Sequence, residues 1–496
     1  MVGPPSGEAA WPGLPVSETP DPSPQAAPRR AARSFEYFAR TGSLSGLLLL
    51  ISAVLALAWA NSPWHASYFV LWEQRVSLHF PALSLDLSLL SWINDGLMAA
   101  FFLLVGLEIK RELLVGELAS RRRAALPLGA AVGGMIVPAL IYWGLIPTGE
   151  ASAGWAMPMA TDIAFALGVL ALLGPRVPLG LKVFLTALAV VDDVGAVLII
   201  AIFYTGGLET VPLAIAALIA SLLVLLNRRR VRHLAPYLLV GLGLWIALHE
   251  SGLHATLTGI VLALAIPSRT RIDAVEFSTR ARGLIREFDR AETGDRLVIT
   301  SQGQQEALYG LETAAEQVQA PLLRLEHGIQ PLVQYGIMPL FAFANAGVRV
   351  VATGGELIRP VTFGVLAGLF LGKPLGISLA SWFVVRRGWA ALPTGTSWTL
   401  IHGVAWLGGI GFTMSLFIAT LAFAGSTNLL AAKLGILAAS TAAGLAGALI
   451  LRRGLRALPA GGSPPPHLPF IGLQQHPDGS DLGGDRNAGR HHRGEE

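Results

Sequence analysis

The chain has 496 residues, of which 53% are hydrophobic and only 14% are charged. Soluble domains carry about 25% charged residues because their surfaces must be solvated, so the composition excludes an ordinary soluble enzyme and a disordered chain. It leaves a polytopic, all-α membrane protein. The chain has no cysteine, which excludes disulfides, iron–sulfur clusters and thiolate-bound zinc.

The composition along the chain predicts three parts. Residues 1–40 are rich in Pro, Ala, Ser and Gly and residues 457–496 in Gly, Pro and His, so both are expected to be disordered tails. Between them, residues 41–456 form a transmembrane domain in which apolar runs recur at about the 20 residues that a spanning helix needs. Twelve spans are predicted, at 44–61, 89–107, 124–145, 155–174, 179–204, 211–226, 234–248, 251–266, 332–348, 361–385, 398–423 and 429–451.

The positive charges predict the orientation of these spans. The net charge is +4, from 36 Lys and Arg against 32 Asp and Glu. If the N-terminus is cytoplasmic, and Lys182 and Lys433 near the ends of their spans are counted with the adjoining loops, the inside segments hold 31 of the 36 positive residues and the outside segments four. The remaining one, Lys373, lies well within a span. Cytoplasmic loops carry the excess of Lys and Arg, so both termini are expected inside. The excess of basic residues is then explained by the membrane topology and does not indicate a nucleic-acid partner.

Two segments between the spans have patterns of their own. Leucines alternate with polar residues over residues 83–89, a period of two that predicts a small external β-hairpin. Residues 267–324 are predicted to be a cytoplasmic connector. Apolar residues recur there at helical spacing from Phe277 to Phe288 and from Leu308 to Val318, which predicts two amphipathic helices.

Ionisable residues inside a span are the strongest functional signal, because each costs at least ~2.5–3.5 kcal/mol at the bilayer centre. One such residue alone is often a neutral, hydrogen-bonded core residue. A set of five favours an ion or proton pathway. The five that lie well within the predicted spans are Asp95, Asp162, Asp192, Asp193 and Lys373.

Asp192 and Asp193 are adjacent in the middle of one span. Neighbours on a helix point about 100° apart, so the two carboxylates cannot share one contact direction, but both can reach one cavity between helices. Two carboxylates in a medium of low dielectric repel each other when both are charged. This repulsion favours protonation of one or both, so that the pair can carry protons near neutral pH. When ionised, the same oxygens suit a small hard cation. The pair therefore has the chemistry that exchange of protons for a cation requires.

Lys373 is the natural counter-charge for this pair. A buried lysine is readily deprotonated, so it can neutralise one aspartate and then exchange partners when an ion arrives. The alternative, that Lys373 forms a purely structural ion pair, has the same weight as a direct role in proton movement.

The fourth and eleventh spans are each expected to be broken. The fourth has Pro158, Thr161 and Asp162 near its start, and the eleventh has three glycines and Thr413 in its middle. Such residues can open a helix and expose carbonyls and helix ends to an ion. Close packing by small residues is the alternative, but paired breaks in the two halves favour an inverted-repeat transporter.

Eight stretches of the chain carry a recognisable pattern: WIND at 92–95, FFLLVGLE at 101–108, ATDIAFALG at 160–168, the pair at 192–193, SGLHATL at 251–257, PLFAFANAG at 339–347, GKPLGI at 372–377 and GIGFTMS at 409–415. In these stretches the chain resembles the bacterial NhaA-type sodium–proton antiporter family, over about residues 42–453. The resemblance implies the inverted-repeat antiporter fold. It also implies an electrogenic, pH-regulated secondary transporter that exchanges Na⁺ or Li⁺ for H⁺ across the inner membrane, for sodium and pH homeostasis.

The resemblance also implies residue roles. Asp193 would be the main sodium ligand, with Asp192 pairing Lys373 and joining proton exchange. Thr161 and Asp162 would form the broken-helix site. The pH-sensing residues would be Glu108, Arg111, Glu112, His254, Glu326 and His327.

The remaining implications concern partners. The resemblance implies no enzymatic activity and no cofactor beside the transported Na⁺ and H⁺. It implies a protein embedded in membrane lipid, and a homodimer formed through the hairpin region at 83–89. The chain departs from the best-known members at Leu323 and Gln330, where a Lys and a His flank the Glu-His pair, and in its longer connector.

Two rival functions remain to be weighed. A sodium-coupled symporter of similar fold is the nearest, but the adjacent aspartates with Lys373 argue against it. An intramembrane aspartyl protease also needs two buried aspartates, but places them on separate helices with a Gly-x-Gly-Asp signature that this chain lacks.

Overall fold

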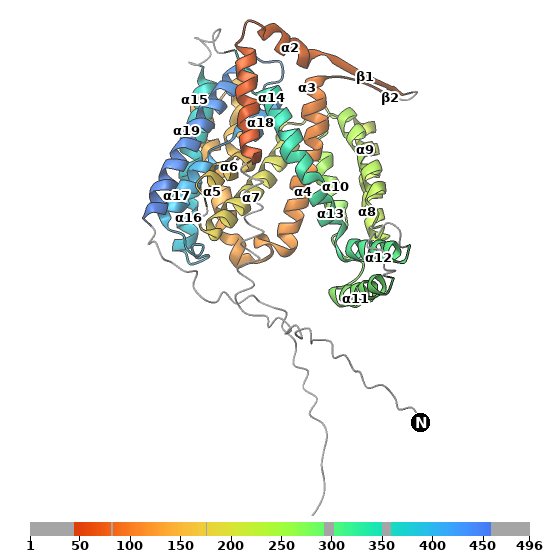
Figure 1. The fold of residues 1–496 in the computed structure, drawn as a ribbon. Coiled ribbons are helices and arrows are strands. Elements are labelled where there is room, and N and C mark those ends of the chain that lie inside the picture. Colours follow the sequence, from red (N-terminus) through yellow and green to blue (C-terminus); the bar gives the residue numbers. More distant parts are fainter. Residues whose placement is uncertain (1–43, 81–82, 175, 292–301, 350–358, 458–496) are drawn as a thin grey trace, which may run out of the picture. The chain divides into compact units, whose positions relative to one another are not determined.

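The computed structural model describes residues 44–80, 83–174, 176–291, 302–349 and 359–457. The predicted N-terminal tail lies outside this range, as does nearly all of the C-terminal one. Within it the chain is mostly helical, and the long helices run side by side (Figure 1).

The elements follow one another with short connections. The first part consists of the helix Leu44–Ala60, α2 (His65–Glu73), β1 (Arg75–Phe80), β2 (Leu83–Ser88), α3 (Leu89–Ser91), the π-helical η1 (Trp92–Leu97), α4 (Met98–Val115), the 3₁₀-helical η2 (Glu117–Ala119) and α5 (Arg121–Leu145). The second consists of the 3₁₀-helical η3 (Glu150–Met159), α6 (Ile163–Leu172), α7 (Leu179–Phe203), α8 (Thr210–Arg228), α9 (Leu234–Glu250), α10 (Leu257–Ala265), α11 (Ala274–Arg290) and α12 (Gln302–Val318). The third consists of α13 (Pro321–Leu332), the π-helical η5 (Val333–Ile337), α14 (Met338–Asn345), α15 (Pro360–Ala367), the π-helical η7 (Gly368–Gly372), α16 (Lys373–Arg386), α17 (Trp398–Gly408), α18 (Phe412–Ala422) and α19 (Asn428–Arg456).

Many of these helices have the length and composition to cross a membrane. Among the described residues seven qualify, or nine if each of two bent helix pairs counts as one span. The bent pairs are Leu44–Ala60 with α2, and η3 with α6. The chain is thus a multi-pass membrane protein. The number of twelve spans stays a prediction, since some apolar helices are shorter, such as α9 with 17 residues.

The helices α5 and α16 pack closely where glycines face each other. A Cβ atom on Gly376 of α16 would lie 2.1 Å from the carbonyl oxygen of Gly133 on α5, and one on Gly133 would lie 2.4 Å from that of Gly376. The two backbones therefore touch at this crossing, which small residues alone permit. The contact fixes α16, and with it Lys373 at its start, against α5.

The strands β1 and β2 pair antiparallel, with Arg75 opposite Ser88 and Ser77 opposite Asp86 (Figure 1). Leu85 packs against Trp245 of α9, which accounts for the apolar half of the alternation. On the other face, the Ser77 hydroxyl and the Arg75 guanidinium each lie 2.7 Å from the Asp86 carboxylate, and these contacts hold the pKa of Asp86 below its usual value. An external position and a dimer contact stay predictions.

The connector contains two helices where the apolar spacing predicts them, α11 and α12, and they lie crosswise to the long helices (Figure 1). They pack on each other: a Cβ on Gly310 of α12 would meet the Leu284 side chain of α11 at 2.7 Å. The Asp273 side chain caps α11 by accepting from the Glu276 amide at 2.8 Å.

Candidate ion-exchange site

The centre of the site is the point where two interrupted helical segments meet. One interruption lies at residues 160–162, between η3 and α6, and the other at residues 409–411, between α17 and α18. The Asp162 amide donates to the Ile410 carbonyl at 2.7 Å, and the Thr161 hydroxyl lies 2.9 Å from the Gly408 carbonyl. Backbone groups freed by one break are thus satisfied partly by the other, as a membrane interior requires.

Asp162 sits at the start of two helices at once. Its Oδ1 accepts from the Phe165 amide of α6 at 2.9 Å, as a helix N-cap does. Its Oδ2 accepts from the amide and the hydroxyl of Thr413, at 3.1 and 2.5 Å, in the first turn of α18. A carboxylate stabilises the positive N-terminal end of a helix, and here one carboxylate serves two.

Lys373 and Asp192 form an ion pair from which water is excluded. Lys373 Nζ lies 2.8 Å from Asp192 Oδ2, and both side chains are 0% exposed. Lys373 also donates to the carbonyl of Met159, the last residue of η3. The Thr161 hydroxyl lies 2.6 Å from the same Oδ2, whereas Asp192 Oδ1 has no partner among the described residues. Breaking such a pair from one side is costly, because it leaves an uncompensated buried charge.

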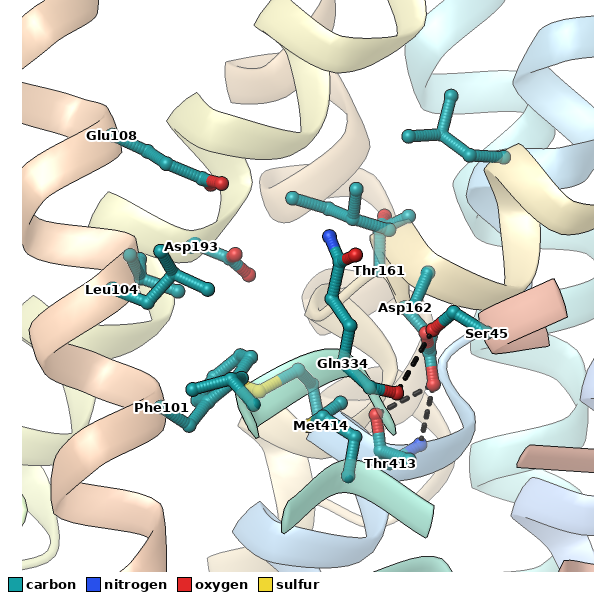
Figure 2. Close-up of a pocket in the computed structure, with 16 residues that line it drawn as sticks. Ser45, Phe101, Leu104, Glu108, Thr161, Asp162, Asp193, Gln334, Thr413 and Met414 are labelled. Atoms are coloured by element: carbon teal, nitrogen blue, oxygen red, sulfur yellow. Dashed lines mark hydrogen bonds between the residues drawn. The ribbon is translucent and has the colours of Figure 1, made fainter. Parts of the chain in front are cut away.

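Asp193 has a different environment from its neighbour, because the helical turn aims its side chain elsewhere. It is buried, its Oδ1 has no partner in the described part of the chain, and it lines a cavity of about 80 Å³ (Figure 2). A water molecule needs roughly 10–15 Å³ of such space, so the cavity admits several waters or a partly hydrated ion. The lining residues are Ser45, Phe101, Leu104, Val105, Glu108, Thr161, Asp162, Ile163, Ala164, Leu167, Asp193, Val333, Gln334, Met338, Thr413 and Met414.

The residues expected to sense pH lie in different parts of the structure. Glu108 of α4 lines the cavity together with Asp193. A second group lies apart from the cavity lining: the Arg111 guanidinium donates to Glu326 Oε1 and lies 3.3 Å from Glu112 Oε1. Glu326 is 2% exposed, and its Oε2 has no partner among the described residues.

The two histidines of the same prediction do not line the cavity. His254 packs its ring against Phe417, with centroids 5.6 Å apart, and its Nδ1 lies 3.3 Å from the Thr256 hydroxyl. His327 is exposed. Asp95, the remaining charged residue of a span, also lies away from the cavity lining, and its carbonyl accepts from the Trp245 indole at 2.9 Å.

Two features of the site are not accessible from charge patterns. The Met159 carbonyl is a backbone group, and nothing in the sequence marks it as a partner of Lys373. Gln334 lines the cavity but carries no charge, so a search for ionisable residues passes over it. Searching the predicted spans for uncharged amides as well as charges would have found it.

The site combines a buried lysine–aspartate pair with an adjacent carboxylate that faces a small cavity, near the point where two interrupted helical segments meet. These are features of a membrane protein that moves ions, namely a secondary transporter, and not of an enzyme.

Comparison with known sequences gives the family. The Na⁺/H⁺ antiporter 1 family matches residues 36–451, and the chain belongs to this family. It is 49% identical over 440 residues to the Na⁺/H⁺ antiporter NhaA of Oleidesulfovibrio alaskensis, covering 88% of this chain and 98% of that protein. The NhaA antiporters of Acidithiobacillus ferrooxidans and Koribacter versatilis are 50% and 48% identical, and each match covers 84% of this chain and 96% and 91% of the relative.

Proposed function

We propose that the chain exchanges Na⁺ or Li⁺ for H⁺ across a bacterial inner membrane, in an electrogenic and pH-regulated cycle that serves sodium and pH homeostasis. The observation that carries the proposal is the contrast between two adjacent carboxylates. Asp192 is held through its Oδ2 by Lys373 and Thr161 and does not line the cavity, whereas Asp193 lines the cavity and has no such ion pair among the described residues.

This contrast suits competition between protons and a cation. Either a proton or a small hard cation can satisfy Asp193, but not both, because each removes the negative charge that attracts the other. When the cation approaches, its charge weakens the attraction between Asp192 and Lys373, and the lysine can lose a proton. More than one proton would then leave per cation, and net charge would move across the membrane.

The proposal includes the arrangement in the membrane. Twelve spans in an inverted repeat would carry the site near the bilayer centre and expose it alternately to the two sides. The termini and the connector would lie in the cytoplasm, and the hairpin at 83–89 would join two copies into a homodimer. Glu108 and the group around Arg111 would set the pH response.

The decisive experiment replaces Asp193, the carboxylate that faces the cavity. In inverted membrane vesicles, adding Na⁺ should collapse a preformed ΔpH in the wild type and have no such effect in Asp193→Asn. Asp289→Asn, at an exposed position of α11, is the matched control and should behave as the wild type. If Asp193→Asn retained sodium-driven collapse of ΔpH at wild-type sodium concentrations, the proposed site would be wrong.

A further inference from the structure

Gln334 lies in an irregular stretch of helix. It belongs to η5, five π-helical residues inserted between α13 and α14. Such insertions into an α-helix are uncommon and occur frequently at functional sites, because the wider turn re-aims the side chains. The Ser45 hydroxyl, from the helix Leu44–Ala60, donates to the main-chain carbonyl of Gln334 at 3.2 Å. This bond links the π-helical stretch to a neighbouring helix.

The side chain of Gln334 points into the cavity that Asp193 lines. Figure 2 shows its amide in the middle of the cavity, with Asp193 on one side and Thr161 on the other. Among the described residues the side-chain amide makes no hydrogen bond, although the side chain is half-buried. A polar group in this position is set to meet something that enters the cavity.

The chemistry of the cavity shows what is missing around an incoming cation. Hard cations take several oxygen ligands, and one carboxylate supplies at most two. The Asp162 oxygens already accept hydrogen bonds from both helix ends, and Asp192 Oδ2 is held by Lys373 and Thr161. Gln334 offers a carbonyl oxygen that is neutral at every pH and can complete the set without competing for a proton.

We propose that Gln334 is a cation ligand that contributes to the affinity and selectivity of the cavity for Na⁺ and Li⁺. The inference rests on the exchange proposed above. It assigns the residue to cation binding and not to the proton side of the cycle, because an amide does not titrate.

The test compares three substitutions in inverted vesicles over a series of Na⁺ and Li⁺ concentrations. Gln334→Ala and the nearly isosteric Gln334→Met remove the oxygen, and both should raise the half-saturating Na⁺ concentration about three- to ten-fold, as expected for loss of one neutral polar contact. The maximal rate and the pH profile at saturating Na⁺ should stay within about two-fold of the wild type. Gln334→Glu keeps an oxygen in place and should not raise the half-saturating concentration.

The design separates a ligand from a residue that only supports the helix. A ligand substitution should change the ratio of the half-saturating Li⁺ and Na⁺ concentrations, because the smaller ion needs a tighter set of oxygens. A packing defect would lower the maximal rate with both ions and leave the ratio unchanged. Gln302→Ala, an exposed glutamine of α12, is the control.

Two outcomes are distinct failures. If the wild type itself shows no sodium-driven change of ΔpH, the proposed function fails. If the wild type exchanges cations and both Gln334→Ala and Gln334→Met keep its half-saturating concentrations and its ion ratio, Gln334 is not a ligand. Should Gln334→Ala not accumulate in the membrane, Gln334→Met answers the same question, since its volume is preserved.

Discussion

A lysine surrounded by protein and lipid is stable only with a counter-charge, and Lys373 has one in Asp192. The pair is also bonded to uncharged groups: the Met159 carbonyl accepts from the lysine, and the Thr161 hydroxyl lies 2.6 Å from the carboxylate. These extra bonds offset part of the cost of taking two charges out of water. They also hold the η3–α6 break against α7 and α16, so the pair is expected to contribute to stability as well as to the proposed exchange.

A double-mutant cycle tests this coupling. Lys373→Met alone should destabilise the protein by about 3–5 kcal/mol, because Asp192 is left as a lone buried charge. Lys373→Met combined with Asp192→Asn should recover much of that loss, since no charge then remains unpaired. Thermal unfolding of the purified protein in detergent measures the effect. If Lys373→Met alone were as stable as the wild type, the pair would have no structural role.

At the level of elements, the site depends on backbone contacts between helices that are far apart in sequence. The carbonyls of Gly133 and Gly376 lie where any side chain on the facing glycine would collide. This close approach of α5 and α16 places Lys373, at the N-terminal end of α16, near the η3–α6 break.

Two glycines of the same helix provide a matched test of that contact. A Cβ on Gly133 would lie 2.4 Å from both the Ala380 Cβ and the Gly376 oxygen, so Gly133→Ala should cost about 1–3 kcal/mol through overpacking. A Cβ on Gly144 has no neighbour within 4 Å, and Gly144→Ala should be neutral or mildly stabilising, because alanine favours helix. Thermal midpoints of the two variants compare them directly. Similar shifts in both would mean that the α5–α16 crossing is not tight.

At the level of the whole molecule, the distribution of Lys and Arg predicts an orientation in the membrane that can be tested. The chain lacks cysteine, so one introduced thiol is the only one present and reports on one position. Two exposed side chains on opposite predicted sides are suitable: Trp64, 75% exposed, on the predicted outside, and Val275, 76% exposed, in the connector.

Labelling with a membrane-impermeant maleimide tests the topology. In right-side-out vesicles the reagent should modify Trp64→Cys and spare Val275→Cys, and in inverted vesicles the pattern should reverse. The cysteine-free wild type is the blank. Modification of Val275→Cys in right-side-out vesicles would place the connector outside the cell and contradict the predicted orientation.

The sequence by itself determined the membrane class and most helix positions, and it singled out Asp162, Asp192, Asp193 and Lys373 as charged residues within apolar spans. Charges inside apolar runs are rare and costly, so they stand out without any structure. The spacing of Phe277 to Phe288 and Leu308 to Val318 likewise determined α11 and α12. Local patterns suffice in these cases because burial and helical periodicity are local properties.

Only the tertiary structure decided how these residues meet. Helical geometry separates Asp192 from Asp193 by about 100°, but it does not say which of them faces Lys373 and which faces the cavity. The family resemblance implied that Asp192 pairs with Lys373, and the tertiary structure shows that contact. Three features depend on contacts between segments far apart in sequence or on backbone atoms. They are the capping of two helices by Asp162, the hydrogen bond from Lys373 to the Met159 carbonyl, and the position of the Gln334 amide in the cavity. A sequence pattern indicates the free-energy cost or gain of each residue taken alone. The candidate site, in contrast, depends on contacts between helices, which only the packing of the folded chain establishes.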